Sequence, residues 1–246
     1  MTLSDSSQAL ASASSNKTGL RSHCSPWLTP IVYPLGCKLL LPSFFGRITV
    51  TGQEHLPTAG PVLLAPTHRS RWDALLVPYA AGRLVTGRNL RFMVTATEVR
   101  GLQGWFIRRL GGFPVNPERP AIASLRLGVE LLQQREMLVI FPEGGIFRDG
   151  QVHDLRPGPA RIALQAEASQ PDLGVKVVPM SLRYDPVVPH FGADVNIRIG
   201  KPLAVADYRR ASQKENAKQL THDLKAAMTQ LDQAMPDPDR TLVAVR

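Results

Sequence analysis

Cysteine is scarce in this sequence. The 246 residues include only Cys24 and Cys37, and neither belongs to a C-x-x-C pair or to a cluster of cysteine and histidine residues. This pattern argues against a disulfide framework and against a structural zinc site. We therefore expect no metal site, and cysteine usage of this kind agrees with a reducing compartment.

The sequence also lacks an N-terminal secretory signal. Residues 1–25 are rich in serine and alanine, carry a single acid, Asp5, and contain no compact apolar run. A secretory signal needs such a run behind a basic start. We interpret residues 1–25 as a disordered tail, with a cleaved organelle-targeting segment as the alternative, and we expect residues 236–246 to form a second tail.

No long hydrophobic run is unbroken. The most apolar stretch, residues 26–46, is interrupted by three prolines and a lysine: Pro30, Pro34, Lys38 and Pro42. A spanning helix needs about 20 mostly apolar residues, so the sequence does not favour a single transmembrane helix. We expect a membrane-associating segment that lies in the bilayer interface, with Trp27, Tyr33 and Lys38 as anchors. A buried N-terminal helix packed on the core is equally consistent with the pattern.

Acidic residues are outnumbered, and aromatic residues make up only 6% of the chain. The formal net charge of +9 favours an anionic partner, either nucleic acid or an acidic membrane face. No recognition-helix, zinc-finger or RNP-type pattern is present, which makes nucleic-acid binding the weaker interpretation. Seven arginines and two glutamates lie between Arg83 and Arg119, around Leu102, Trp105 and Phe106. We favour a membrane-facing surface there over a solvated one.

Short apolar runs alternate with helix-like stretches along the rest of the chain. Six runs have strand character: Ile48–Val50, Val62–Ala65, Phe92–Thr95, Leu138–Phe141, Val175–Ser181 and Val195–Ile199. Helices are predicted near Trp72–Ala81, Pro120–Gln134 and Pro159–Ala168, and an amphipathic helix within 207–234, for which Asp207 is the predicted N-cap. This alternation predicts an α/β fold with a mainly parallel central sheet covered by helices on both faces, formed by one domain over residues 47–235.

A histidine and an aspartate follow the predicted strand Val62–Ala65. His68 comes three residues after that strand, and Asp73 lies where the next helix should begin. Histidine can accept a proton efficiently near neutral pH, and a carboxylate on its other ring nitrogen fixes the tautomer. The arrangement follows the logic of a serine-protease triad, with a substrate hydroxyl as the nucleophile. Alone, an His-x4-Asp pair is weak evidence, because a helix-capping aspartate and an unrelated histidine give the same pattern.

Three further segments strengthen the hypothesis. A glycine-rich stretch runs from Gly111 to Val115, a buried-strand candidate ends in Phe141-Pro142-Glu143-Gly144, and an apolar strand carries Val178-Pro179. Together with His68 and Asp73, these segments resemble the conserved blocks of the glycerolipid acyltransferases, in the same order and with similar separations. The resemblance covers roughly residues 45–205 and is closest to the 1-acylglycerol-3-phosphate (lysophosphatidate) acyltransferases.

The resemblance implies a reaction and a set of residues. It implies transfer of a fatty acyl group from acyl-CoA or acyl-carrier protein to a hydroxyl of a phosphate-bearing lysolipid, with His68 as base, Asp73 as its orienter, and no cofactor. The implied substrate-binding residues are Gly112, Arg119, Glu143, Gly144, Arg148 and Arg156. Glu143 would hold either the acceptor or the loop that carries it. We expect such an enzyme on the cytoplasmic face of a membrane, as a peripheral or monotopic protein.

The sequence departs from the family pattern at two arginines. The arginine that usually ends the second block is displaced here to Arg119, and Gly145-Ile146-Phe147 precede Arg148 after the third block. Both departures leave the acceptor open between lysophosphatidate, glycerol-3-phosphate and another lysophospholipid. A basic nucleic-acid-binding protein is the alternative outside enzymes. A hydrolase is not favoured, because the Gly-x-Ser-x-Gly nucleophile elbow is missing.

Overall fold

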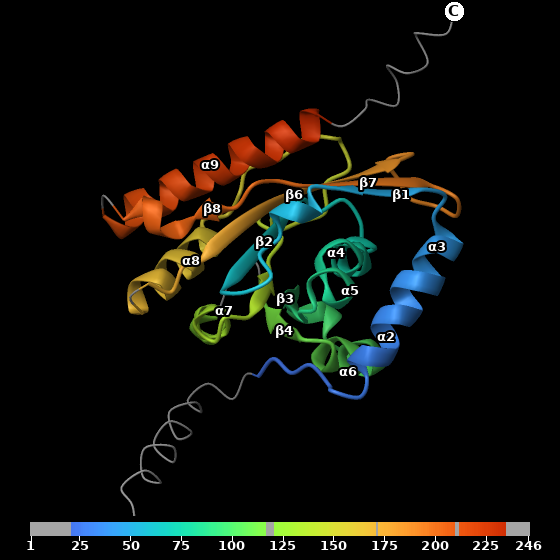
Figure 1. The fold of residues 1–246 in the computed structure, drawn as a ribbon, viewed down its shortest axis with the longest axis horizontal. Helices are drawn as coiled ribbons and strands as arrows, with labels where there is room; N and C mark the ends of the chain where they lie inside the picture. Colours follow the sequence, from blue (N-terminus) through green and yellow to red (C-terminus); the bar gives the residue numbers. More distant parts are fainter. Residues whose placement is uncertain (1–20, 117–120, 171, 210–211, 235–246) are drawn as a thin grey trace, which may run out of the picture.

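The computed structural model describes residues 21–116, 121–170, 172–209 and 212–234. A single eight-stranded sheet lies at its centre (Figure 1). The strands are β1 (Ile48–Thr51), β2 (Val62–Pro66), β3 (Leu90–Thr95), β4 (Gly112–Val115), β5 (Met137–Val139), β6 (Lys176–Asp185), β7 (Asp194–Ile199) and β8 (Leu203–Ala204). The helices are α2 (Thr29–Leu35), α3 (Leu41–Phe44), α4 (Asp73–Ala81), α5 (Arg83–Thr86), α6 (Gly101–Arg109), α7 (Ile122–Gln133), α8 (Gly158–Ser169) and α9 (Gln213–Gln233).

The sheet is mainly parallel, as predicted. Its strand order is β1-β7-β6-β2-β5-β3-β4, and the pairs from β6 to β4 are all parallel. Antiparallel pairing is confined to β6, which pairs with β8 near its start and with β7 near its end. Pro179 lies between these two pairings, after Val177 and before Met180. Proline has no backbone N–H and cannot donate a hydrogen bond to a neighbouring strand. Its position between the β8 and β7 pairings therefore allows a proline within the central strand β6.

Helices cover both faces of the sheet, which agrees with the predicted layers. One apolar cluster joins the sheet to α7, α8 and α9, and a second joins it to α3 and α4. Figure 1 shows α7, α8 and α9 on one side, with α4 and the blue α2–α3 segment on the other. The all-buried pattern of β2 follows from this double cover, because neither face of a central parallel strand meets water.

The apolar segment 26–46 is helical and has two different faces. A π-helical stretch, η1 (Gly36–Leu40), joins α2 to α3. Leu28, Cys37 and Leu41 are buried, whereas an outer stripe at four-residue spacing is 54–60% exposed: Trp27, Ile31, Leu35 and Leu39. The buried face agrees with the interpretation of a helix packed on the core, and the membrane-associating role of the exposed stripe stays a prediction. Among the described residues, no helix has both the length and the apolar character needed to cross a bilayer.

Two details near the ends of the chain differ from the sequence-based expectations. Residues 22–25, which we assigned to the N-terminal tail, pack on the domain, where Cys24 forms an antiparallel bridge with Leu110. The last helix begins later than predicted, at Gln213, because Ser212 supplies a capping box; Asp207 instead lies in a 3-10 turn, η4 (Val205–Tyr208). The remaining residues of both predicted tails, 1–20 and 236–246, lie outside the described residues.

Candidate active site

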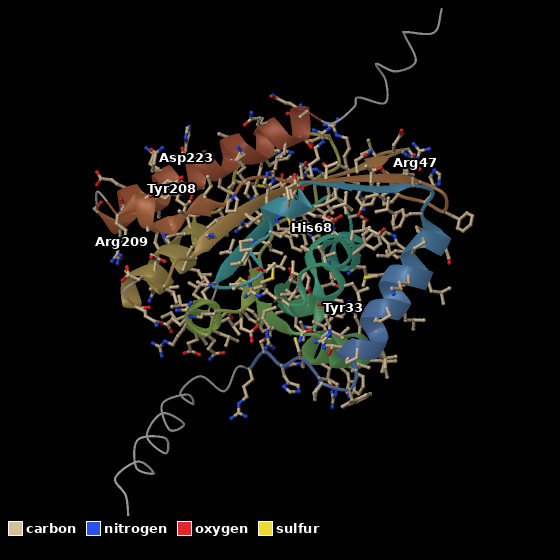
Figure 2. The ribbon with its side chains drawn as sticks, viewed as in Figure 1. Tyr33, Arg47, His68, Tyr208, Arg209 and Asp223 are labelled. Atoms are coloured by element: carbon tan, nitrogen blue, oxygen red, sulfur yellow. The ribbon has the colours of Figure 1, made fainter. Side chains whose placement is uncertain are left out.

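The site is centred on the turn that follows β2. His68 lies two residues beyond Pro66, the last residue of the strand, and Asp73 is the first residue of α4. The two side chains meet as the sequence suggested: Nδ1 of His68 is 2.9 Å from Oδ2 of Asp73. Figure 2 shows His68 between the end of β2 and α4. Ends of parallel strands are where open α/β sheets place reactive groups.

Asp73 is fully buried and its carboxylate is saturated with donors. Oδ2 accepts hydrogen bonds from the backbone N–H groups of Arg69 (2.6 Å) and Ser70 (2.8 Å), in addition to the contact with His68. Oδ1 accepts from the hydroxyl group of Tyr184 on β6. A carboxylate that receives this many hydrogen bonds is held in one position.

Tyr184 was not expected from the sequence. It is 2% exposed and approaches Asp73 from a strand 111 residues further along the chain. Burial, with the nearby Asp73 charge as the second cause, raises the pKa of Tyr184 well above its ordinary value. The hydroxyl therefore stays protonated and stays a donor. No local sequence pattern indicates this contact, because it depends on the register between β6 and β2.

The side chain of Glu143 is bonded to other groups of the protein. Its side chain is fully buried, and its two oxygens each lie 3.1 Å from Nη1 of Arg69. Oε2 also accepts from the backbone N–H of His68 at 2.8 Å, and Oε1 from that of His153 at 3.0 Å. Of the two roles expected for Glu143, contact with the acceptor is therefore not supported by this geometry. The geometry supports a hold on the loops around His68.

Arg69 is a second residue that the sequence did not single out. It is 4% exposed, and besides Glu143 it contacts the carbonyl of Gln151 at 2.8 Å. Buried arginines are rare and are normally paired, so this ion pair fixes the loop after β5 against the loop after β2. The Phe147 N–H donates to the His68 carbonyl at 2.9 Å and joins the same two loops a second time.

Two features favour glycine at position 144, its backbone conformation and the close approach of Arg156. Its φ is +72°, and a Cβ atom there would lie 2.2 Å from Nε of Arg156. Glycine at this position thus allows the Arg156 side chain to lie directly on the loop after β5. Arg156 is itself exposed, and so is Arg148, whose Nε approaches the Arg69 carbonyl at 3.4 Å. Both cations belong to the loop that carries Glu143.

The structure does not bring every predicted site residue to His68. Gly112 opens β4 in a packed position, where a Cβ atom would meet Cγ2 of Ile107 at 2.3 Å. The parallel strands β2 and β4 start at the same edge of the sheet, whereas His68 follows the opposite end of β2. Gly112 thus lies against α6 and away from His68, and its substrate contact stays a prediction. Arg119 lies outside the described residues.

One aromatic side chain stacks on the histidine, and two others stack on each other where α4 begins. The ring of Phe141 stacks on His68 with centroids 4.0 Å apart, and Trp72 stacks on Phe44 at 4.3 Å. His68 keeps 20% of its side-chain surface exposed, and its Nε2 has no hydrogen-bond partner in the described part of the chain. With Asp73 on Nδ1, the free ring nitrogen is the acceptor that a general base needs. The arrangement can remove a proton from a hydroxyl brought against this open side.

Residues 47–183 match the model of the protein family described as Acyltransferase. That range contains His68, Asp73 and Glu143. The chain belongs to the Acyltransferase family. The family assignment predicted from the four sequence blocks is confirmed, while the roles of individual residues in this acyltransferase remain proposals.

Curated relatives of this acyltransferase carry two kinds of name. "Glycerol-3-phosphate acyltransferase 1, mitochondrial" of Mus musculus is 31% identical over 180 residues, which cover 66% of this chain and 21% of the mouse protein. This acyltransferase therefore spans about a fifth of the length of such relatives. "1-acyl-sn-glycerol-3-phosphate acyltransferase" of Bacillus subtilis is 25% identical over 202 residues, which cover 79% of this chain and 92% of that protein.

A solved structure has the same fold as this acyltransferase. It is the crystal structure of the 1-acyl-sn-glycerophosphate (LPA) acyltransferase PlsC from Thermotoga maritima, with a TM-score of 0.64. The match covers 86% of this chain and 82% of that one at 22% sequence identity. At this identity the likeness is one of fold, and it agrees with the predicted mainly parallel α/β architecture.

Proposed function

We propose that this acyltransferase moves a fatty acyl group from a thioester, acyl-CoA or acyl-carrier protein, to the free hydroxyl of 1-acyl-glycerol-3-phosphate, giving phosphatidic acid. The observation that carries the proposal is the His68–Asp73 contact at the end of a buried strand, inside the region that matches the family. Relatives named for this acceptor are covered over 70% and 92% of their own length. They support lysophosphatidate as the first acceptor to test.

In the proposed reaction His68 acts as the general base. Its Nε2 takes the proton of the acceptor hydroxyl while the hydroxyl oxygen attacks the thioester carbonyl carbon. Asp73 holds the ring through Nδ1 and stabilises the imidazolium that forms. When the carbon–sulfur bond breaks, the thiolate leaves and takes the proton back from His68. A thiol of this kind has a pKa of about 8.5, so it departs without a strong acid.

The developing oxyanion needs backbone N–H donors that are not already used within the protein. The N–H groups of Arg69 and Ser70, just before α4, donate to Asp73 and are therefore not assigned this role. Gly145 and Ile146 belong to the loop that the Phe147 N–H joins to His68, and within the described chain their own N–H groups have no partner. We assign the oxyanion to these two groups, because preorganised N–H donors act most strongly in a partly dry site.

The acceptor phosphate is assigned to exposed arginines of the same loop. Arg148 and Arg156 follow Glu143, both are exposed, and Arg156 lies against Gly144. A guanidinium presents two parallel donors to a phosphate, which suits an acceptor that must be held while its hydroxyl reacts. Arg119 stays a sequence-based candidate for the same role. Glu143 is proposed to position this loop rather than to touch the acceptor.

Membrane association at a lipid surface, on the cytoplasmic face, is part of the proposal. A lysolipid acceptor resides in a bilayer, and the stripe formed by Trp27, Ile31, Leu35 and Leu39 leaves a continuous apolar surface on the outer face of α2 and η1. An apolar face of this kind, with Lys38 beside it, is typical of helices that lie in the interfacial region. We propose a peripheral or monotopic attachment through this stripe.

Glycerol-3-phosphate is the second candidate acceptor. It is favoured by the 31% identity to proteins named glycerol-3-phosphate acyltransferase, which exceeds the 25% identity to the Bacillus subtilis relative. The two acceptors share the glycerol phosphate and differ in the reacting hydroxyl. It is the second-position hydroxyl in 1-acyl-glycerol-3-phosphate and the first-position hydroxyl in glycerol-3-phosphate. The proposed chemistry of His68 is the same for both.

A comparison of acceptors tests the proposal. Purified protein is supplied with acyl-CoA or acyl-carrier protein as donor and with lysophosphatidate, glycerol-3-phosphate or lysophosphatidylcholine as acceptor. The proposal predicts the highest kcat/KM with lysophosphatidate. A higher kcat/KM with glycerol-3-phosphate selects the second candidate. Transfer to lysophosphatidylcholine and to neither of the other two acceptors contradicts both candidates. The protein would then accept the phosphate only as part of a zwitterionic head group.

A further inference from the structure

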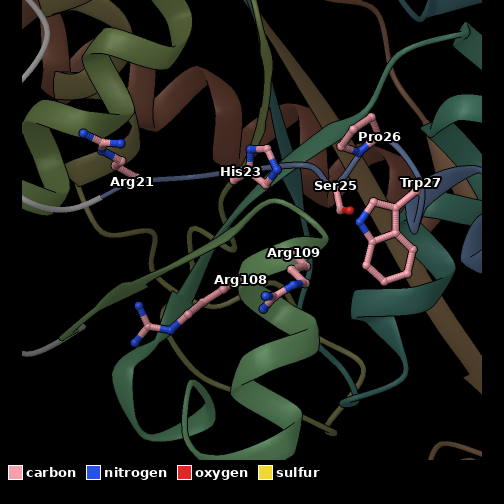
Figure 3. A pocket seen from close by; sticks show the side chains of 7 residues that line it. All are labelled: Arg21, His23, Ser25, Pro26, Trp27, Arg108 and Arg109. Carbon is pink, nitrogen blue, oxygen red and sulfur yellow. The ribbon is translucent and has the colours of Figure 1, made fainter.

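A cleft of about 380 Å³ shares no lining residue with the site around His68. One wall is formed by the segment that precedes α2, and the other by the last residues of α6 (Figure 3). Its lining residues include three arginines, a histidine and a tryptophan: Arg21, His23, Trp27, Arg108 and Arg109. None of its lining residues in the described part of the chain is acidic.

The two walls are joined by backbone hydrogen bonds, so the cleft is a built feature of the domain. The N–H of Ser25 donates to the carbonyl of Arg109 at 2.8 Å, and the N–H of Gly111 donates to the carbonyl of His23 at 3.0 Å. The Ser22 hydroxyl adds a third bond, to the carbonyl of Gly111 at 2.7 Å. The arginines at the end of α6 are therefore held opposite the N-terminal segment.

Arg108 and Arg109 supply positive charge on the α6 wall of the cleft. The ion pairs among the described residues include none with Arg108 or Arg109. Arg109 instead lies over the ring of Trp105 at 4.0 Å, an arrangement that orients a guanidinium without removing its charge. A fork-shaped cation of this kind favours phosphate and carboxylate ligands.

Exposed apolar side chains flank the cleft on both sides. On α6, Leu102 is 74% exposed, and Trp105 and Phe106 are 37% and 39% exposed. On the other side Trp27, 60% exposed, begins the outer stripe of α2. Basic groups between apolar flanks match the boundary of a bilayer, where phosphates lie just outside the acyl chains. They match an acidic soluble protein less well, because such a partner would leave these apolar flanks facing water.

We propose that this cleft binds the phosphate of an anionic membrane phospholipid, at a site separate from the catalytic one. The cleft adjoins the start of β4, whereas His68 follows the end of β2, and the strands between them are parallel. The outer stripe begins at Trp27 beside the cleft, and α3 ends at Phe44, which stacks on Trp72 near His68. A lipid held in the cleft thus fixes one end of the stripe while the acceptor approaches the other end. This inference deepens the membrane association proposed above and rests on it.

Vesicle binding by the full chain tests the inference without relying on activity. Binding of the wild type and of the double variant Arg108→Gln/Arg109→Gln is measured on phosphatidylcholine vesicles with and without phosphatidic acid. The matched control is Arg126→Gln/Arg161→Gln, which removes the same charge from exposed positions on α7 and α8, on the other side of the sheet. Each arginine at an anionic surface is expected to contribute about fivefold in affinity, so the cleft variant should lose about thirtyfold and the control far less.

A single variant guards against a folding artefact, because Arg109 also contacts Trp105. Arg108→Gln removes an exposed side chain and should alone weaken binding about fivefold. Equal losses in the cleft and control variants would mean attraction by net charge only and would overturn the inference, while membrane association would stand. Unchanged vesicle binding with lost activity on acyl-carrier protein would assign the cleft to that acidic partner instead. If the wild type binds no anionic vesicles, the inference and the proposed membrane association both fail.

Discussion

The hydroxyl group of Tyr184 donates a hydrogen bond to Oδ1 of Asp73, while Oδ2 of the same carboxylate contacts Nδ1 of His68. Tyr184 is thus a positioning residue that acts on the histidine through the aspartate. The three side chains come from β6, α4 and the turn after β2. They depend on the central pairing of β2 with β6, so the geometry of the site is coupled to the sheet itself.

Replacing Tyr184 with phenylalanine should lower kcat and leave KM nearly unchanged. The variant removes one donor from a buried charged carboxylate, a loss of about 1.5–3 kcal/mol in the free energy of unfolding. Asp73 keeps its other donors, so we expect kcat to fall roughly tenfold, less than in a His68 variant. Steady-state kinetics and denaturant unfolding measure both effects. Tyr79→Phe on α4 is the control, and an equal change in kcat there would contradict the positioning role.

Glu143→Gln should destabilise the protein as well as the site. The substitution leaves the guanidinium of Arg69 buried without its charged partner. Breaking a buried ion pair in this way typically costs about 3–5 kcal/mol, which chemical denaturation can measure. If Glu143 instead bound the acceptor directly, the variant would raise KM with little change in the free energy of unfolding. That pattern would contradict the role assigned here.

Gly144→Ala should disturb the loop that carries Arg156. A side chain at φ +72° is strained by about 1–2 kcal/mol, and the new Cβ atom would lie 2.2 Å from Nε of Arg156. We expect lower stability and a raised KM for the phosphate-bearing acceptor, because Arg156 must move. Gly158→Ala is the matched control, since a Cβ atom there meets nothing within 4 Å. Similar effects in both variants would argue against a specific role for the contact between Gly144 and Arg156.

Much of the fold could be predicted from local sequence. The six predicted strands and the three central helices all exist, because runs of apolar residues and helical spacing reflect burial on a two-sided sheet. The N-terminus of α9 was placed wrongly, at Asp207, because two polar residues could cap it and the capping box of Ser212 prevails. The strand β4 was missed, since Gly112 and Pro114 lower its strand propensity while its pairing with β3 sustains it.

The side-chain contacts of the site were predictable from local sequence only where the two residues are close in the chain. The contact between His68 and Asp73 spans five positions, and the turn before α4 brings the two side chains together. Arg69 and Tyr184 were missed because their partners lie 74 and 111 residues away. Gly112 was assigned to substrate through the family resemblance; in the fold it makes room for Ile107, a contact that local sequence does not show. Long-range register decides such cases, and no local pattern reveals it.

The outer stripe of α2 gives a prediction about membrane attachment. Ile31 is 60% exposed, and Ile31→Asn should weaken binding to lipid vesicles by about tenfold, since full burial of such a side chain is worth about 1.5–3 kcal/mol. Vesicle sedimentation at fixed lipid composition measures the effect. Ile122→Asn changes an equally apolar residue, 76% exposed, at the start of α7 on the other side of the sheet. Equal losses in both variants would contradict attachment through the stripe.

The most direct test of the central claim is acyl transfer from a thioester to lysophosphatidate by the wild type and by His68→Ala at matched protein concentration. His68 is 20% exposed, and among the described residues its ring forms a hydrogen bond only with Asp73. The variant should therefore fold. The account predicts that kcat falls by at least about 10²-fold, the usual contribution of a general base, with little change in KM. Transfer by His68→Ala at a rate near that of the wild type would contradict it.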